Sequence, residues 1–246
     1  MAAGLSRIFW WHRQVGDNLW AGFTNTSAGN LALHVGDDPA AVRQRRSELE
    51  TAMGVHPGSL QFMNQIHSAV VVDASGPADT GGPDPGAPTA DGLFSPDGRT
   101  PLAVLVADCL PVLLAGTGAG GHPVTAAVHA GRKGLLDGIL PAAVDRMQAA
   151  GAADLHAWIG PCVCGSCYEV PAAMQEDAVR LLPATEALTR RGTPALDLPA
   201  GAEAQLAALG VRVERIAGCT LENEQLSSHR RDPSSGRIAG VIWRRA

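Results

Sequence analysis

The chain has 246 residues, a formal net charge of −5 and a hydrophobic fraction of 46%. That length can bury a substantial core, in one large domain or two small ones. A negative overall charge does not favour binding to nucleic acid or to an anionic membrane surface, so we expect neither partner.

The same composition favours a cytoplasmic protein. No uninterrupted apolar run reaches the ~20 residues that a membrane-spanning helix needs. Residues 1–20 carry aromatic and charged side chains where a signal peptide would need an apolar stretch. Five cysteines are an odd number, which in a reducing compartment favours free thiols or metal ligands over disulfides. We expect a monomer or a small homo-oligomer.

The first part of the chain predicts a hairpin, a helix and a strand. Residues 5–23 favour a hairpin that joins a sheet. Asp38 and Pro39 are typical of a helix N-cap and first helical residue, and Gly54 of a C-cap, so a helix is expected between them. A β-branched run follows and predicts a strand with His67 at its beginning.

The middle of the chain predicts a loop followed by three buried strands. Residues 75–92 are rich in Pro, Gly and Asp and predict a surface loop rather than a domain linker. LAVLVA, LPVLLA and VTAAVHA are continuous apolar runs between residues 102 and 130, typical of strands covered on both faces. The first of these runs ends at Asp108-Cys109 and the third at His129, which can do chemistry, rather than at turn residues.

The second half mixes helices with strands. An amphipathic helix with a break at Pro141 is expected first, then a strand and a cysteine-rich turn. Two helices are expected next, one opened by Pro171 and one over residues 195–210, followed by an alternating strand and a final apolar run. The pattern predicts an α+β (mixed α/β) fold in which residues 1–246 form a single domain with a central mixed sheet.

His67, Cys109 and His129 form the candidate constellation. Two imidazoles and a thiolate are a normal ligand set for catalytic zinc, with the fourth position left for water or substrate. Two alternatives stay open from the residues alone: a Cys–His nucleophile pair without metal, and a buried thiol beside hydrogen-bonded histidines.

Several strings together resemble the YfiH-like family, first described as multicopper polyphenol oxidase or laccase-domain proteins. They are GNLALHVGDDP, FMNQIHSAVVV, TADGL, VLVADCLPVLL, AAVHAGRKG, AWIGPCVCGSCYEV and CTLENEQLSSHRRDPSSGR. The resemblance implies the family's α+β fold and metal binding by His67, Cys109 and His129. It also implies a zinc-dependent enzyme whose substrates are purine nucleosides and inorganic phosphate. Its reactions would be phosphorolysis of inosine, adenosine, guanosine and methylthioadenosine, and deamination of adenosine.

The chain departs from this family at the predicted phosphate site. Arg132 and Lys133 stand where the family usually has Trp-Arg, and the loop at residues 23–30 lacks a common arginine. A strand end, a glycine turn, two cations and a helix start would together suit an oxyanion, and we expect Lys133 to contribute to phosphate binding. Arg230, or its neighbour Arg231, is a further anion contact.

His34 and Asp91 lie in family-like strings and could line the substrate pocket. A hydrogen bond that braces a loop is the competing interpretation for both residues.

The residues allow three other interpretations. Copper is the alternative metal, for a polyphenol oxidase (laccase), but eight histidines without a His-x-His pair fit a multicopper site poorly. A peptidoglycan-editing or interaction factor is the non-enzymatic alternative. Cys162, Cys164 and Cys167 could chelate zinc with His156, although we expect a tight turn with partly buried thiols.

Overall fold

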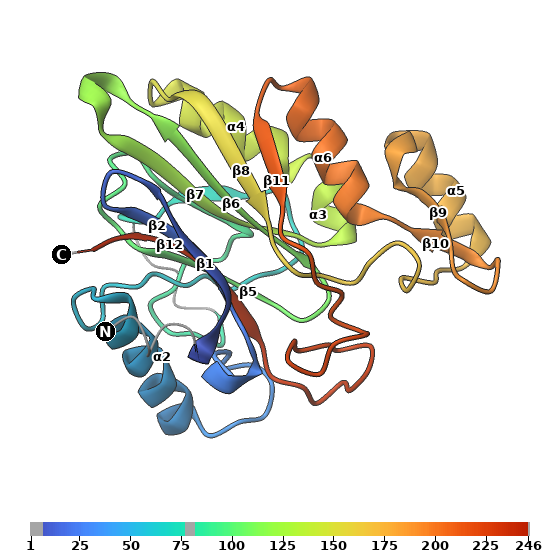
Figure 1. Ribbon diagram of the computed structural model, residues 1–246, viewed down its shortest axis with the longest axis horizontal. Coiled ribbons are helices and arrows are strands. Elements are labelled where there is room, and N and C mark those ends of the chain that lie inside the picture. Colours follow the sequence, from blue (N-terminus) through green and yellow to red (C-terminus); the bar gives the residue numbers. More distant parts are fainter. Residues whose placement is uncertain (1–6, 77–81, 246) are drawn as a thin grey trace.

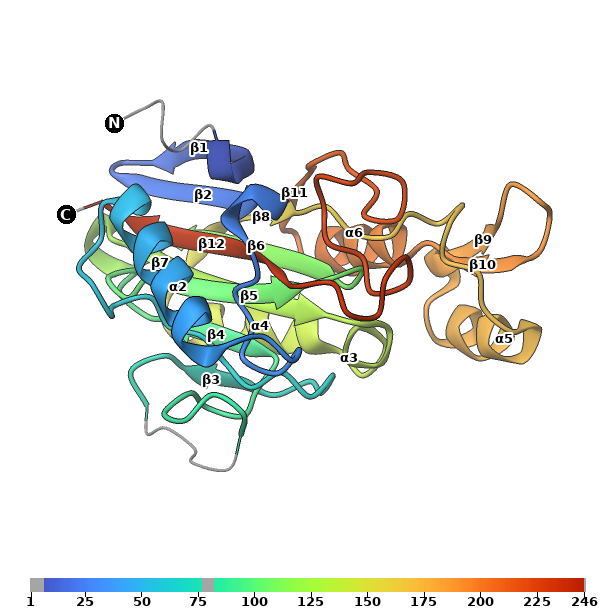
Figure 2. The ribbon, with the colours of Figure 1, turned by 90° about the horizontal axis from the view of Figure 1, so that it is seen from below.

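Two β-sheets lie face to face, with helices on their outer faces (Figure 1, Figure 2), in a computed structural model that describes residues 7–76 and 82–245. The first sheet has the order β1-β2-β12-β5 and is antiparallel. Its strands are β1 (Phe9–Gly16), β2 (Leu19–Thr24), β5 (Leu102–Val106) and β12 (Ile238–Arg244). Helix α2 (Pro39–Met53) covers its outer face.

The second sheet has the order β11-β8-β6-β7-β4-β3 and is mixed. Its strands are β3 (Val71–Asp73), β4 (Gly92–Ser95), β6 (Leu110–Thr117), β7 (Pro123–Ala130), β8 (Ala153–Ile159) and β11 (Arg212–Arg215). Its outer face is covered by α3 (Arg132–Leu136), α4 (Ile139–Ala149) and α6 (Leu198–Ala208).

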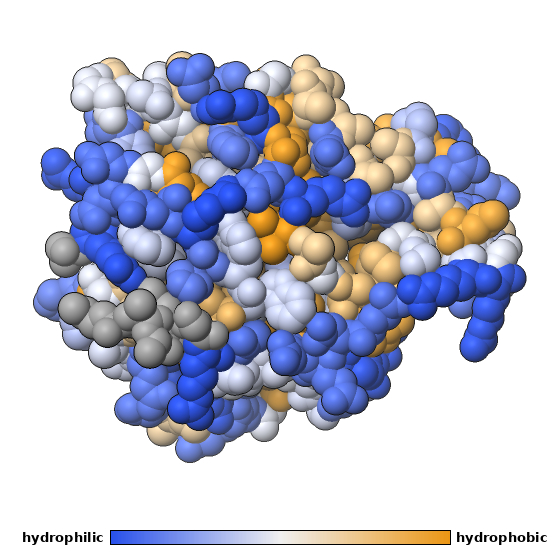
Figure 3. Space-filling model, viewed as in Figure 1, coloured by the Kyte–Doolittle hydropathy of each residue, from blue (hydrophilic) through white to orange (hydrophobic). Residues whose placement is uncertain are grey.

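A smaller unit projects from one end of these layers (Figure 1). It contains α5 (Ala172–Leu181) and the two-stranded sheet of β9 (Glu186–Leu188) and β10 (Pro194–Leu196). Hydrophilic side chains cover its hairpin tip, whereas apolar ones gather near β8, β11 and α6 (Figure 3). Short 3₁₀ turns complete the fold: η1 (Thr26–Ala28), η2 (Ala119–Gly121) and η3 (Pro183–Thr185).

Strand β5 shows how the sequence produces the layers. Leu102, Val104 and Val106 face the core between the two sheets, and Ala103 and Leu105 face the core beneath α2. Alternate residues of a strand point to opposite faces, so a strand covered on both sides must be apolar throughout. The prediction of fully buried strands from the continuous apolar runs is confirmed.

The mixed α/β character is also confirmed, but the expected central sheet is two sheets. The chain turns at Asp108, whose φ is 85°, and β6 continues in the sheet opposite β5. An apolar run does not encode which sheet it joins, because both sheets bury both faces. The strand expected at His67 is shorter than predicted, since β3 begins at Val71.

The predicted caps of α2 are confirmed, and the predicted break at Pro141 in α4 is wrong. The Asp38 side chain accepts a hydrogen bond of 3.0 Å from the Ala40 amide, and Gly54 ends the helix in the left-handed conformation. The amphipathic helix expected around Pro141 is divided into α3 and α4 at Gly138, with φ of 89°, and not at Pro141. Pro141 lies in the first turn of α4, where a proline has no intrahelical hydrogen bond to lose.

Residues 195–210 also differ from the single helix expected. Ala195 and Leu196 belong to β10, and α6 begins after Asp197, whose side chain accepts from the Ala200 amide at 2.9 Å. Among the described residues, no helix is long and apolar enough to cross a membrane. Of the loop predicted at residues 75–92, residues 77–81 lie outside the described part.

Candidate active site

The chemistry-bearing residues meet at one edge of the six-stranded sheet. Cys109 directly precedes β6, and His129 lies near the end of β7, where it pairs with Pro111 of β6. Asp91 directly precedes β4, and its carbonyl accepts a hydrogen bond of 2.7 Å from the His129 amide. Because β4, β6 and β7 are neighbours, three distant parts of the sequence come together at this edge.

Asp91 is the centre of the hydrogen bonding at this edge. Its side chain is completely buried, and Oδ1 accepts from Nδ1 of His129 at 2.7 Å and from the His67 amide at 3.0 Å. Oδ2 accepts from the amide and the hydroxyl of Ser68 at 2.6 and 2.7 Å. The carboxylate therefore braces the loop and the histidine and does not line the pocket, which is the second of the two interpretations for this residue.

His67 lies on a tightly held loop. Its φ of 61° is in the left-handed region, which is uncommon for a non-glycine residue, and the bonds to Asp91 hold it there. Gly131 makes room for its ring: a Cβ at position 131 would lie 2.7 Å from Cδ2 of His67 and 3.3 Å from Sγ of Cys109. Gly134 likewise lets Ser68 approach, since a Cβ there would lie 2.6 Å from the Ser68 carbonyl oxygen.

His67, Cys109 and His129 are close enough to hold one metal ion. Their ligand atoms lie within 4.8 Å of one another, and Sγ of Cys109 is 3.8 Å from Nε2 of His67. The hydrogen bond to Asp91 occupies Nδ1 of His129 and leaves Nε2 to face the cluster, as is usual for a metal-binding histidine. His67 is exposed and His129 is buried, so one side of the cluster is open to solvent. The donor set fits zinc with an open coordination position.

The electrostatics of the cluster favour charged forms. Burial opposes ionisation of Asp91, but hydrogen bonds from His129 and Ser68 lower its pKa to about 2. Burial likewise opposes ionisation of Cys109, but hydrogen bonds from His129 and His67 lower its pKa to about 6. Burial disfavours the charged form of His129, whereas its bonds to Asp91 and Cys109 raise its pKa to about 9. Without metal, the thiol is thus a thiolate near neutral pH.

Asp108 ties the cluster to the loops on its other side. Its Oδ1 accepts a hydrogen bond of 2.6 Å from the Thr220 hydroxyl, and its Oδ2 accepts one of 2.7 Å from the Arg230 amide. Its carbonyl accepts from the Val163 amide at 3.0 Å. With φ of 85°, Asp108 is the second site residue in the left-handed region. One strained turn therefore positions Cys109 and three loop segments together.

A pocket of about 430 Å³ opens beside Cys109. It is lined by Ala107, Asp108, Cys109, Arg132, Val163, Tyr168, Leu198, His229, Arg230 and Pro233. Small-molecule sites commonly have this volume and this mixture of apolar walls with a few polar groups. The Arg230 guanidinium donates to the Glu169 carbonyl at 2.8 Å and lies 4.8 Å from the centre of the Tyr168 ring.

The two cations predicted to bind phosphate point to different places. Arg132 lines the pocket, whereas the Lys133 side chain is 66% exposed and forms an ion pair with Asp137, one helical turn on. Adjacent residues of a helix point in different directions, and α3 is a single short helix of five residues. Lys133 is therefore not among the residues that line this pocket. Arg231 is also occupied elsewhere, because its guanidinium donates to loop carbonyls, including that of Leu226 at 2.6 Å.

His34 and Arg237 lie within electrostatic range of the cluster. Burial and the positive charges of Arg237, Arg46 and His129 lower the pKa of His34. Burial lowers the pKa of Arg237, while the negative charges of Cys109 and Asp108 oppose this shift. Arg237 is the last residue of a family-like string but is not among the site residues predicted from the sequence. Arg237 and Cys109 lie far apart in the sequence, so no local pattern predicts that they are close in the fold.

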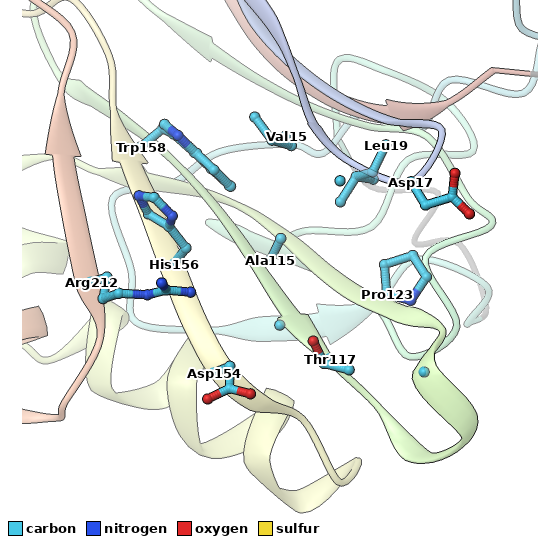
Figure 4. A pocket seen from close by; sticks show the side chains of 13 residues that line it. Val15, Asp17, Leu19, Ala115, Thr117, Pro123, Asp154, His156, Trp158 and Arg212 are labelled. Carbon is cyan, nitrogen blue, oxygen red and sulfur yellow. The ribbon is translucent and has the colours of Figure 1, made fainter.

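His156 belongs to a different part of the surface. It stacks on Trp158 with ring centroids 4.4 Å apart and lines a larger hollow of about 650 Å³ between the β1–β2 hairpin and the strands of the second sheet (Figure 4). His67, Cys109 and His129 are not among the residues that line this hollow. Cys162 is almost completely buried in the core beside α6. Neither residue belongs to the group of potential metal ligands that contains Cys164 and Cys167.

The chain is similar to characterised proteins and solved structures over nearly its whole length. A family model described as multi-copper polyphenol oxidoreductase laccase matches residues 20–245. A Streptomyces griseus protein named purine nucleoside phosphorylase ORF3 is 44% identical over 230 residues, which are 91% of each chain. Escherichia coli YfiH, also named a purine nucleoside phosphorylase, is 35% identical over 224 residues, covering 87% of this chain and 85% of the relative.

The structural relatives agree with the sequence relatives. The crystal structure of a Neisseria meningitidis protein is 31% identical, with a TM-score of 0.77, and the match covers 94% of this chain and 96% of that one. The crystal structure of YlmD from Geobacillus stearothermophilus is 27% identical, with a TM-score of 0.78, and the match covers 98% of this chain and 100% of that one.

Proposed function

The chain belongs to the family described as multi-copper polyphenol oxidoreductase laccase, the laccase-domain or YfiH-like family, and we propose that it is a zinc-dependent purine nucleoside phosphorylase. Its substrates are a purine nucleoside (inosine, adenosine, guanosine or methylthioadenosine) and inorganic phosphate. The reaction is cleavage of the glycosidic bond by phosphate, and the expected location is the cytoplasm.

One juxtaposition supports this function most strongly. Cys109, one member of the His67–Cys109–His129 cluster, lines a pocket together with Arg132 and Arg230, so the metal-binding group adjoins a cavity that holds two cations. Relatives that share 35–44% identity with this chain carry the name purine nucleoside phosphorylase. A nucleoside and an oxyanion need the kinds of surface that this cavity has: apolar walls, one aromatic ring and positive charge.

The proposed roles follow from the position of each group. Arg132 and Arg230 hold the phosphate, since guanidinium groups bind oxyanions through paired N–H donors. Tyr168 and Leu198 provide an aromatic and an apolar wall for the nucleoside. As an oxygen of phosphate bonds to C1′ of the ribose, the bond from C1′ to the purine breaks and the purine accepts a proton. Protonated His229 is the proposed proton donor: its Nδ1–H donates to the Pro233 carbonyl oxygen at 3.2 Å, so the proton that moves to the purine is the one on Nε2.

The metal is held by His67, Cys109 and His129 in this proposal. When bound, zinc supplies Lewis acidity beside the substrate and lowers the pKa of water. Asp91 positions both histidines through its buried hydrogen bonds. Asp108 fixes the strained turn that presents Cys109.

Deamination of adenosine by water, giving inosine and ammonia, is a second reaction proposed at the same cluster. Zinc deaminases of other folds use a comparable set of histidine and cysteine ligands. They also use a glutamate from an H-x-E motif as the proton carrier, and this chain has no such motif. We therefore expect deamination to be slower than phosphorolysis.

Copper is the alternative metal, because two imidazoles and a thiolate also form blue-copper sites. A multicopper oxidase needs further histidine clusters. Within residues 7–76 and 82–245, the one other group of potential metal ligands contains no histidine. Copper therefore suits a single site at most, and we prefer zinc.

Product analysis tests the proposed function. Purified protein is incubated with inosine, adenosine or methylthioadenosine, with and without phosphate, and the products are separated by chromatography. We expect free base and ribose 1-phosphate from inosine, formed only when phosphate is present. Oxidation of a phenol with no nucleoside cleavage would favour the copper enzyme. No reaction with either substrate class would favour a peptidoglycan-editing or interaction factor.

A further inference from the structure

A second group of metal-ligating side chains lies outside the candidate active site. Cys164, Cys167, Cys219 and Glu222 place their ligand atoms within 4.8 Å of one another. All five cysteines of the chain are free thiols in the structure. We propose that these four residues, the Cys₃Glu cluster, form a second zinc site whose role is structural.

Two matching turns build the cluster. In the first, the amides of Cys167 and Tyr168 donate to the Cys164 carbonyl at 2.9 and 3.0 Å. In the second, the amides of Glu222 and Asn223 donate to the Cys219 carbonyl at 3.2 and 3.1 Å. Each turn therefore presents its ligands at positions i and i+3 with the same backbone hydrogen bonds. Paired ligands on short turns are the usual framework of a structural zinc site.

The backbone holds the two turns against each other. Strands β8 and β11 are parallel neighbours, so the loops that leave them start at the same edge of the sheet (Figure 1). The Thr220 amide donates to the Cys162 carbonyl at 3.0 Å, and the Cys162 amide donates to the Gly218 carbonyl at 3.3 Å. This pairing brings the thiols together without any metal, and it explains why Cys162 supports the cluster but does not belong to it.

The fourth ligand is already directed at the thiols. Oε1 of Glu222 accepts a hydrogen bond of 3.3 Å from Sγ of Cys167. Arg190, from the β9–β10 hairpin, forms an ion pair with the same carboxylate. Three thiolates and a carboxylate would exceed the charge of a zinc ion, and the guanidinium offsets part of that excess. Soft thiolate ligands select zinc over magnesium or calcium.

The site's consequence is local stability beside the pocket. Cys167 precedes Tyr168, which lines the pocket, and Cys219 precedes Thr220, whose hydroxyl holds Asp108. Zinc at the cluster would fix both turns at once, because binding energy gained only in the folded state stabilises that state.

Metal content in a set of four proteins tests the proposal. Wild type, Cys109→Ser, Cys219→Ser and the Cys109→Ser/Cys219→Ser double variant are loaded with zinc, freed of excess metal and analysed for zinc per chain. Circular dichroism checks that each is folded. We expect about two, one, one and no zinc ions respectively, given one ion per ligand set. A folded Cys109→Ser protein without zinc, or a Cys219→Ser protein with wild-type zinc, would overturn the proposal.

Cobalt and heat give readouts that do not depend on counting zinc. Cobalt bound to Cys109→Ser should show thiolate-to-metal absorption from three thiolates, whereas cobalt bound to Cys219→Ser should show absorption from one. A chelator should lower the melting temperature of zinc-loaded Cys109→Ser and leave that of the double variant unchanged. A disulfide among Cys164, Cys167 and Cys219 in freshly reduced, zinc-treated protein would also contradict the metal site.

Discussion

Oδ1 of Asp91 accepts a hydrogen bond of 2.7 Å from Nδ1 of His129, and the Asp91 side chain is completely buried. The same oxygen accepts from the His67 amide, so one carboxylate sets the position of two of the three metal ligands. Interactions of this kind commonly change metal affinity 10- to 100-fold when they are removed.

Asp91→Asn should therefore weaken zinc binding at the active site by about 10- to 100-fold. The side-chain NH2 group of Asn would point its hydrogens at N–H groups that now donate to the Asp91 carboxylate. Donors would then face donors, so His67 and His129 lose their alignment. Zinc competition with a chromophoric chelator measures the affinity. Asp145→Asn on the exposed side of α4 is the control and should match wild type. Equal affinity in the two variants would remove Asp91 from its positioning role.

Gly131→Ala should reduce zinc at the same cluster for a steric reason alone. The backbone at Gly131 has φ of −66°, which alanine accepts, but its Cβ would lie 2.7 Å from the His67 ring. We expect a folded protein whose active-site zinc dissociates faster, measured by transfer to a chelator. Gly16→Ala is the matched control, because its Cβ would lie 3.4 Å from the nearest atom. Identical dissociation rates in both variants would show that His67 is not held as described.

Arg132→Ala should raise the KM for phosphate more than the KM for inosine. Arg132 lines the pocket, so its loss removes a charged contact to the oxyanion. Lys133→Ala should leave both values near wild type, because Lys133 pairs with Asp137 outside the pocket. Steady-state kinetics with each substrate varied in turn measures the effect. A larger phosphate effect for Lys133→Ala would restore the expectation drawn from the sequence.

Metal-free protein should carry a thiolate at Cys109 above pH 6. The ordinary pKa of the thiol is 9.0, and the hydrogen bonds from His129 and His67 lower it to about 6, so the reactive form persists through neutral pH. Alkylation of Cys109, followed by peptide mass spectrometry, should rise with pH to a plateau with a midpoint near 6 and should be suppressed by zinc. A midpoint near 9 would contradict this electrostatic description of the cluster.

Strand ends made much of this site predictable from sequence. Cys109 and His129 stood out because reactive side chains ended buried apolar runs, and both lie at the same sheet edge. His67 was a candidate as the histidine at the beginning of an expected strand, and the family resemblance points to the same residue, although it lies in an irregular loop before β3. The cap residues Asp38 and Gly54 predicted the bounds of α2, because a cap interacts only with residues a few positions away in the sequence.

Long-range geometry was less accessible. Nothing in the sequence indicated which of Arg132 and Lys133 lines the pocket, because that depends on the direction in which α3 leaves Gly131. The partner of Cys164 and Cys167 is Cys219 rather than His156, because the parallel pairing of β8 with β11 decides which loops meet. The helix breaks at Gly138 and not at the predicted Pro141, because proline in the first turn of a helix is well tolerated.

The most direct measurement is the recovery of phosphorolysis as zinc is returned to metal-free protein. Inosine and phosphate are supplied, hypoxanthine is quantified, and wild type is compared with Cys109→Ala under the same conditions. We predict that wild type regains activity with added zinc, that omission of phosphate abolishes it, and that Cys109→Ala stays inactive at every zinc concentration. Full activity of metal-free wild type, or zinc-restored activity of Cys109→Ala, would contradict a catalytic role for the His67–Cys109–His129 cluster.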